Sequence, residues 1–205
     1  MRARLEDVQC NRASSRPDSA RKSILEGYNK PRRKIVKAAA IQIRPATASD
    51  ADAWLPLIDA LADYEKLERP DAAARQRLLL DAFGERPRTE VYLAESGGRV
   101  VGYAITLFTY SSFLALPTLY LEDLFVLESH RGEGAGYRLF THCVEEAHRR
   151  GCGRMEWQVL DWNRLAIDFY ERLGARQMKE WLPYRMVRED MEALLSEKRA
   201  GQASG

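Results

Sequence analysis

Two neighbouring carboxylates, Glu122 and Asp123, interrupt an apolar stretch of this 205-residue sequence. The surrounding residues, 119–126, are otherwise apolar or aromatic and predict a β-strand. Because neighbouring strand residues point to opposite faces, one carboxylate must enter the interior or a cleft, unless a bulge redirects it. Burial of a carboxylate is costly unless the group is paired or functional. Two readings follow: a general base that takes a proton from an amine, or a salt bridge to a nearby arginine.

A glycine-rich turn follows this strand and precedes an amphipathic stretch typical of a helix, with the sequence Arg131-Gly132-Glu133-Gly134-Ala135-Gly136. The unpaired N–H groups and positive dipole end of a helix start attract anions, and glycine lets the backbone approach them closely. The turn therefore suits a pyrophosphate, with Arg131 as a fixed charge; the alternative is a flexible turn without a ligand. Its register excludes the dinucleotide fingerprint, and no Gly-Lys-Ser/Thr triplet forms a Walker A loop.

Asn163 and Tyr170 lie seven residues apart on a predicted helix. Seven steps of about 100° return within about 20° of the start, so both side chains project along one face. Asn163 is a natural N-cap. Tyr170 is either a core residue or a hydroxyl that donates a proton to a leaving group.

The composition is that of a globular protein, with 45% hydrophobic and 30% charged residues. Three cysteines without a Cys-x-x-Cys pair exclude a disulfide framework and a cysteine-rich zinc site, and no metal is expected. No apolar run approaches the roughly 18 residues that a membrane span needs.

The first 40 residues carry eleven Lys or Arg and four Asp or Glu, a net charge of +7, while the remainder carries −5. They show little periodicity and are read as a basic, disordered extension. A nucleic-acid-binding arm and a transit peptide are the alternatives, and nucleic acid is not favoured because aromatic residues are nearly absent there.

The hydrophobic pattern predicts an α/β domain with a mixed sheet and one right-handed crossover. The expected order is a strand at 41–44, helices at 49–67 and 70–83, a hairpin around Gly97-Gly98, a loop over 110–117, the strand at 119–126, a helix after the glycine turn, a strand through 155–159, a helix from 163 to 173, a strand near 184–187 and a helical tail after Glu189.

Residues 41–188 resemble the GNAT acetyltransferases, and within them the diamine and thialysine acetyltransferase group. The motifs that carry the resemblance are Leu61-Ala-Asp-Tyr64-Glu65, Tyr120-Leu-Glu-Asp-Leu-Phe-Val126, Arg131-x-x-Gly134-x-Gly136, and Trp162-Asn163 followed by Phe169-Tyr170. The resemblance implies the GNAT fold, a catalytic domain at 41–190 and a C-terminal tail at 191–205.

The resemblance also implies roles for single residues. Acetyl-CoA is the co-substrate, Tyr170 protonates the departing thiolate, and Glu122 accepts the amine proton through water. The coenzyme should contact Leu124, Phe125, Val126, Arg131, Gly132, Glu133, Gly134, Ala135, Gly136, Tyr137, Asn163, Arg164, Leu165 and Ala166. The amine should meet Tyr64, Glu65, Glu122, Asp123, Glu156, Trp157 and Gln158.

The resemblance narrows the acceptor. Polyamine-specific members carry an acidic residue in the loop before the central strand, whereas residues 111–117 have none. The run 159–163 is more similar to the thialysine-type members. The expected acceptor is therefore a small primary amine, such as a lysine analogue, ornithine or a short diamine; a protein or peptide amine and a non-catalytic coenzyme sensor are the alternatives. A cytoplasmic homodimer without membrane contact is also expected.

Overall fold

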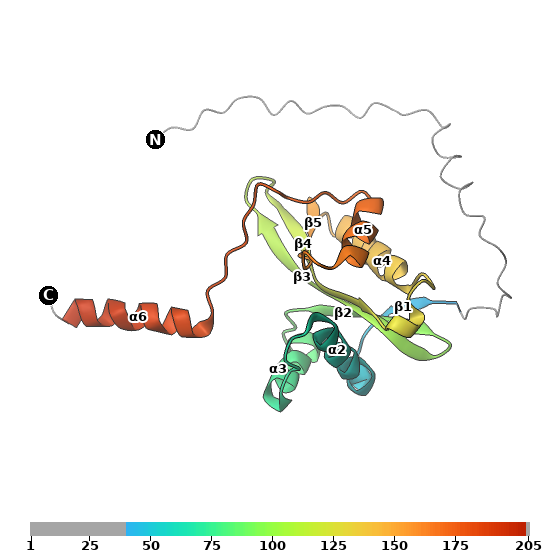
Figure 1. The fold of residues 1–205 in the computed structure, drawn as a ribbon, viewed down its shortest axis with the longest axis horizontal. Helices are drawn as coiled ribbons and strands as arrows, with labels where there is room; N and C mark the ends of the chain where they lie inside the picture. The colour runs from blue at the N-terminus through green and yellow to red at the C-terminus, as the bar shows by residue number, and fades with distance from the viewer. Residues whose placement is uncertain (1–39, 204–205) are drawn as a thin grey trace, which may run out of the picture. The chain divides into compact units, whose positions relative to one another are not determined.

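Residues 40–203 are described in the computed structural model of the chain (Figure 1). The predicted basic extension lies outside these residues, apart from residue 40. The elements in chain order are β1 (Gln42–Pro45), η1 (Ala48–Asp50), α2 (Ala51–Glu65), α3 (Ala72–Phe83), β2 (Glu90–Ser96), β3 (Arg99–Ser111), β4 (Leu116–Val126), η2 (Glu128–His130), α4 (Ala135–Arg149), β5 (Arg154–Glu156), α5 (Arg164–Arg172) and α6 (Arg188–Ala203).

The five strands form one sheet in the order β1-β2-β3-β4-β5. β1 pairs with β2 in the antiparallel sense, whereas β4 pairs with β5 in the parallel sense. A parallel pair needs a crossover connection, and α4 lies in the chain between β4 and β5. The sheet is therefore mixed, which confirms the predicted fold class.

The chain divides into two compact units. The first unit contains the described residues up to Ala104 together with Leu124–His142. The second unit contains Ile105–Asp123 and the described residues from Cys143 onward.

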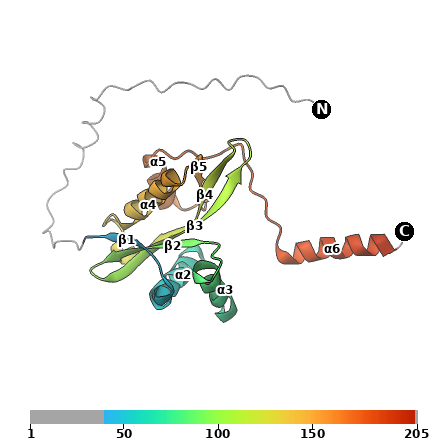
Figure 2. The same ribbon diagram turned by 180° about the vertical axis from the view of Figure 1, so that it is seen from behind.

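The core of the first unit gathers around Trp54, whose side chain is fully buried. Its ring lies 5.6 Å from that of Phe83 on α3 and 6.3 Å from that of Tyr103 on β3, both in edge-on contacts. Both views show α2 and α3 side by side (Figures 1 and 2). α3 begins at Asp71, whose carboxylate accepts a hydrogen bond from the amide of Ala74 at 2.6 Å. The Trp54 contacts hold the first turn of α2 against α3 and β3.

The second unit has its core around Leu119 and Leu121 of β4 and Tyr170 of α5, all buried. Figures 1 and 2 show α5 beside β5. At the start of β5, Gly153 allows a close approach, since a side chain there would meet Leu114 at 3.0 Å and Leu116 at 3.1 Å.

Three predictions about secondary structure were wrong. The loop expected over 110–117 is only a turn, because β3 continues to Ser111 and β4 begins at Leu116. β5 ends at Glu156 rather than near Val159. No strand forms at 184–187: this segment is exposed, and a strand without a neighbour cannot complete its backbone hydrogen bonds. The helical tail after Glu189 is confirmed as α6.

Candidate active site

The turn that leads into α4 belongs to the first unit. Gly132 and Gly134 have positive φ angles of 82° and 92°, which L side chains rarely adopt, and a Cβ at either would meet nothing within 4 Å. Both residues are exposed, and α4 begins at Ala135. The first amides of α4 have no partner within the helix. Exposed, closely approachable backbone beside a helix start is the cradle that a pyrophosphate needs, so the residues fit the coenzyme.

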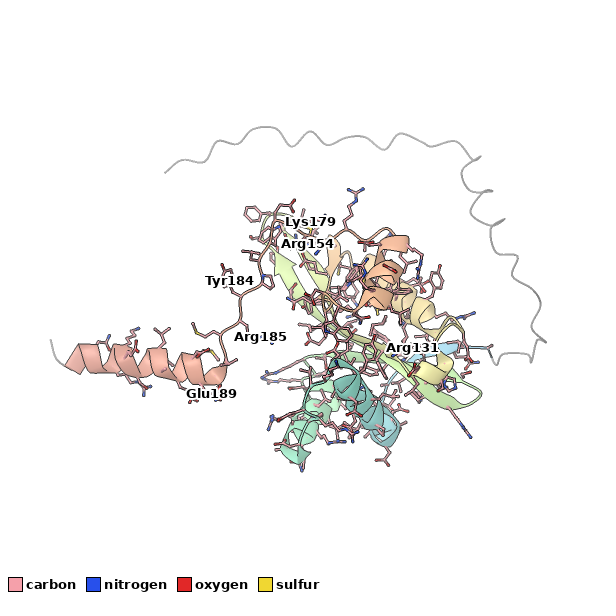
Figure 3. The ribbon with its side chains drawn as sticks, viewed as in Figure 1. Arg131, Arg154, Lys179, Tyr184, Arg185 and Glu189 are labelled. Atoms are coloured by element: carbon pink, nitrogen blue, oxygen red, sulfur yellow. The ribbon has the colours of Figure 1, made fainter. Side chains whose placement is uncertain are left out.

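Arg131, directly before this turn, is half-buried (Figure 3). Its Nε donates a hydrogen bond of 3.1 Å to the carbonyl oxygen of Val126. Its guanidinium carbon lies 4.8 Å from the centre of the Tyr64 ring and 5.9 Å from the centre of the Phe125 ring. The side chain thus contacts α2 as well as the end of β4, and no pattern in the sequence predicts the contact with α2.

The predicted pantetheine strand, 124–126, is the end of β4. The register of β4 with β5 runs from Thr118 to Tyr120, so β4 continues to Val126 beyond the described pairing. Backbone groups that lack a strand partner can bond an extended ligand. Phe125 is buried, and the Val126 carbonyl already accepts from Arg131.

The remaining predicted coenzyme residues lie at the start of α5, in the second unit. The Asn163 side chain caps this helix by accepting from the amide of Ala166 at 3.2 Å. Its function as an N-cap is thereby confirmed. Arg164 and Leu165 are exposed, and Ala166 is half-buried. The first turn of α5 therefore presents a second positive helix end.

Tyr170 lies two turns further along α5 and is buried. Its ring centre is 4.9 Å from that of Trp157 and 5.2 Å from that of Phe169. Burial, with a smaller effect from Cys143, raises the pKa of the Tyr170 hydroxyl to about 12. The hydroxyl is therefore protonated at neutral pH, as a proton donor must be.

The two carboxylates of β4 differ in their surroundings. Asp123 is half-buried and continues the alternation of the buried Leu119 and Leu121. Glu122 is exposed on the other side of the strand, and its carboxylate makes no hydrogen bond or ion pair within residues 40–203. The salt bridge considered for this pair is therefore not made by Glu122 in the described part of the chain.

Tyr120 was not among the predicted site residues. It precedes Glu122 by two positions, which places both on one face of β4, and it is paired with Glu156 across the β4–β5 register. Burial and then the charges of Glu122 and Glu156 raise the pKa of the Tyr120 hydroxyl. Two carboxylates thus act on one tyrosine, although Arg154 lies 3.0 Å from Glu156 and offsets part of its charge. The alternation of the strand could have placed Tyr120 beside Glu122, whereas its neighbour Glu156 follows only from the β4–β5 register.

The other predicted acceptor residues lie in both units. In the first unit, Tyr64 and Glu65 are half-buried at the end of α2, and burial raises the pKa of Glu65. The partial negative charge at this helix end favours a cation. In the second unit, Trp157 contacts Tyr170 and Gln158 is exposed.

Within 40–203, no group of three or more His, Cys, Asp or Glu is arranged to hold a metal ion. None of the helices in that range is long and apolar enough to cross a membrane.

Comparison with known proteins gives consistent matches. The Acetyltransferase (GNAT) family matches residues 54–175. Thialysine N-epsilon-acetyltransferase of Mus musculus is 35% identical over 167 residues, which cover 76% of this chain and 98% of the relative. L-ornithine N5-acetyltransferase NATA1 of Arabidopsis thaliana is 40% identical over 112 residues, covering 54% and 49% of the two chains. Among solved structures, an integron cassette protein from the V. cholerae mobile metagenome has a TM-score of 0.64 at 24% identity, covering 76% of this chain and 97% of that one.

The chain belongs to the GNAT acetyltransferase family, as its motifs predicted. It is an acetyl-CoA-dependent amine N-acetyltransferase with a five-stranded mixed sheet flanked by helices.

Proposed function

We propose that this enzyme acetylates the primary amine of a small cationic molecule, such as a lysine analogue, ornithine or a short diamine. The observation that carries the proposal is the position of two carboxylates beside Tyr120: Glu122 lies two residues further along β4, and Glu156 lies opposite Tyr120 in the β4–β5 register. An alkyl ammonium with a pKa of about 10.4 is a cation at neutral pH and is attracted to such a site. The relatives named above acetylate thialysine and ornithine, by their names, and support the same class of acceptor.

In the proposed reaction, Glu122 attracts the ammonium group and takes its proton, directly or through water. A carboxylate is a far weaker base than an alkyl amine, so a proton taken from the amine must move on from it. The exposure of Glu122 resolves this difficulty, because an exposed carboxylate passes the proton on to solvent. Glu122 therefore attracts the ammonium group and relays its proton to solvent rather than retaining it.

Acetyl-CoA supplies an activated acetyl thioester to which the amine nitrogen forms its new bond. Tyr170 donates its hydroxyl proton to the departing sulfur and regains a proton afterwards. With an ammonium substrate, the overall reaction forms one amide and one thiol and releases one proton. Because the pKa of Tyr170 is about 12, full transfer to a thiol with a pKa of about 8.5 is unfavourable in the free enzyme. Tyr170 thus acts as charge develops on the sulfur, by a hydrogen bond that shortens in the transition state.

The test is a panel of acceptors with acetyl-CoA, followed by the release of free CoA. The panel contains thialysine, lysine, ornithine, putrescine, spermidine, a peptide with a free N-terminus and no acceptor. We expect release with the small amines and little with the peptide. Activity confined to the peptide would overturn the proposal in favour of a protein acetyltransferase.

Glu122→Gln tests the carboxylate, with Glu145→Gln as a matched control on the exposed side of α4. Loss of a general base lowers rates by about 10²-fold or more, and loss of charge also raises the KM for the amine. We expect the pH dependence of kcat/KM to move upward or flatten in Glu122→Gln alone. An unaltered profile would assign the base to another residue.

We also propose that the enzyme is a homodimer in the cytoplasm. Support for a dimer comes from the C-terminal segment, where large apolar side chains remain exposed in the single chain, including Trp181, Leu182, Tyr184, Leu194 and Leu195. Large apolar side chains exposed along one segment are typical of a surface that a partner covers. The described cysteines, Cys143 and Cys152, are unbridged, which suits a reducing compartment. Light scattering of the wild type and of Leu182→Asp tests the dimer, and a monomeric wild type would overturn it.

A further inference from the structure

We propose that Arg131 is a positioning residue that couples the Tyr64 ring on α2 to the coenzyme-binding turn before α4. The affinity for CoA then depends on a side chain at the acceptor end of α2. This inference rests on the proposed function, since it takes residues 132–137 to bind the coenzyme and Tyr64 to face the amine.

Arg131 connects η2 to the turn before α4. Its backbone directly precedes Gly132, whose φ of 82° begins the turn. Its Nε is held by the carbonyl oxygen of Val126 at 3.1 Å. The guanidinium is therefore anchored to the end of β4, one residue before the turn begins.

The Arg131 side chain also contacts α2. The guanidinium carbon lies 4.8 Å from the centre of the Tyr64 ring, within the range of a cation–π interaction. A planar guanidinium also packs on an aromatic face in a way that an ammonium cannot. Arg131 is half-buried, so water screens this contact less than it would on an open surface.

Arg131 also brings a positive charge to the C-terminal end of α2, which carries partial negative charge and the half-buried Glu65. A bound pyrophosphate would attract the same guanidinium toward the turn. Any change in the Tyr64 contact on coenzyme binding therefore contributes to the CoA affinity. If amine binding also changes this contact, linkage requires that CoA and the amine alter each other's affinity by the same factor.

The experiment is a double-mutant cycle read by the Kd for CoA alone, measured by calorimetry on the full chain. It compares the wild type, Tyr64→Leu, Arg131→Met and the double variant. We expect Tyr64→Leu to weaken CoA binding about 3- to 10-fold in the wild-type background and less than about 2-fold in the Arg131→Met background. Any direct contact of Arg131 with phosphate is lost in both backgrounds and cancels in the cycle.

Controls separate coupling from a general loss of structure. Tyr64→Phe keeps the ring and should keep the wild-type Kd for CoA, and Tyr64→Met replaces the leucine variant if that variant does not fold. Tyr110→Leu removes an exposed tyrosine of the other unit and should not change the Kd.

Equal Kd values for the wild type and Tyr64→Leu would overturn the coupling and leave the proposed function standing. Additive effects in the cycle would overturn it as well. If no amine in the acceptor panel is acetylated while the cycle remains non-additive, the proposed function fails and the coupling stands.

Discussion

Predicted site residues lie both in the turn at residues 131–134 and in the helix α5, but the turn offers backbone groups whereas α5 offers a side chain. The turn is exposed and offers backbone amides, which depend on the left-handed conformations of Gly132 and Gly134. α5 offers the buried hydroxyl of Tyr170, which depends on packing against Trp157 and Phe169. Substitutions in the turn should therefore change the affinity for CoA, and substitutions in α5 should change kcat.

The largest effect is expected for Tyr170→Phe, which removes the hydroxyl and keeps the ring contacts. Loss of a general acid lowers the rate by about 10²-fold or more. We expect kcat to fall by that amount while the Kd for CoA stays within about twofold. Rapid-mixing kinetics and calorimetry on the same preparation give both values. Equal losses in kcat and CoA affinity would remove the distinction between the two regions.

A smaller effect is expected for Gly134→Ala, because a left-handed conformation costs an L residue about 1–2 kcal/mol. The substituted turn relaxes in the free enzyme, and coenzyme binding must restore it, so the Kd for CoA should rise about 5- to 30-fold. Gly151→Ala is the matched control, since Gly151 also has a positive φ with open space around it but lies beyond α4. Weakened CoA binding in the control would mean that the loss reflects stability rather than the turn.

Asn163→Ala should lower the free energy of unfolding by about 1 kcal/mol, because the cap to Ala166 is lost. Asn163→Asp keeps an oxygen acceptor and should retain most of the stability. Urea denaturation measures both. An alanine variant with unchanged stability and weakened CoA binding would show that Asn163 contacts the coenzyme rather than stabilising α5.

The smallest effect is expected in the pH dependence of kcat. A general acid is active below its pKa, and that of Tyr170 is about 12, so kcat should show no decline due to Tyr170 as the pH rises to about 9.5. Profiles of kcat from about pH 6.5 to 9.5 test this expectation. A decline in the wild type that disappears in Tyr170→Phe would mean that coenzyme binding lowers the pKa of this tyrosine strongly.

Local signals predicted much of the fold. Asp71 and Gly84 delimit α3, and Gly97 and Gly98 form the turn between β2 and β3, as their residue types indicated. These features depend on a few neighbouring residues. The short β5 and the missing strand near Tyr184 could not be read in the same way, since a strand depends on partners that are distant in the sequence.

The candidate site shows the same limit. The glycine turn and the cap at Asn163 follow from local backbone requirements and were predictable. The contact of Arg131 with Tyr64 joins residues 67 positions apart, and no pattern in either segment indicates it. The position of Tyr120 between two carboxylates needed the β4–β5 register, which the sequence does not reveal.

The exposed segment before α6 has a consequence for the lifetime of the enzyme. Lys179 and Arg185 lie on it, Glu189 follows at the start of α6, and every residue from 176 to 199 is exposed (Figure 3). Extended, exposed backbone is what proteases bind, so trypsin should cut after Lys179 and Arg185 before it reaches the buried core. Association of two copies through this segment would slow that cut as the protein concentration rises. The rate of nicking would then report how much of the enzyme is assembled.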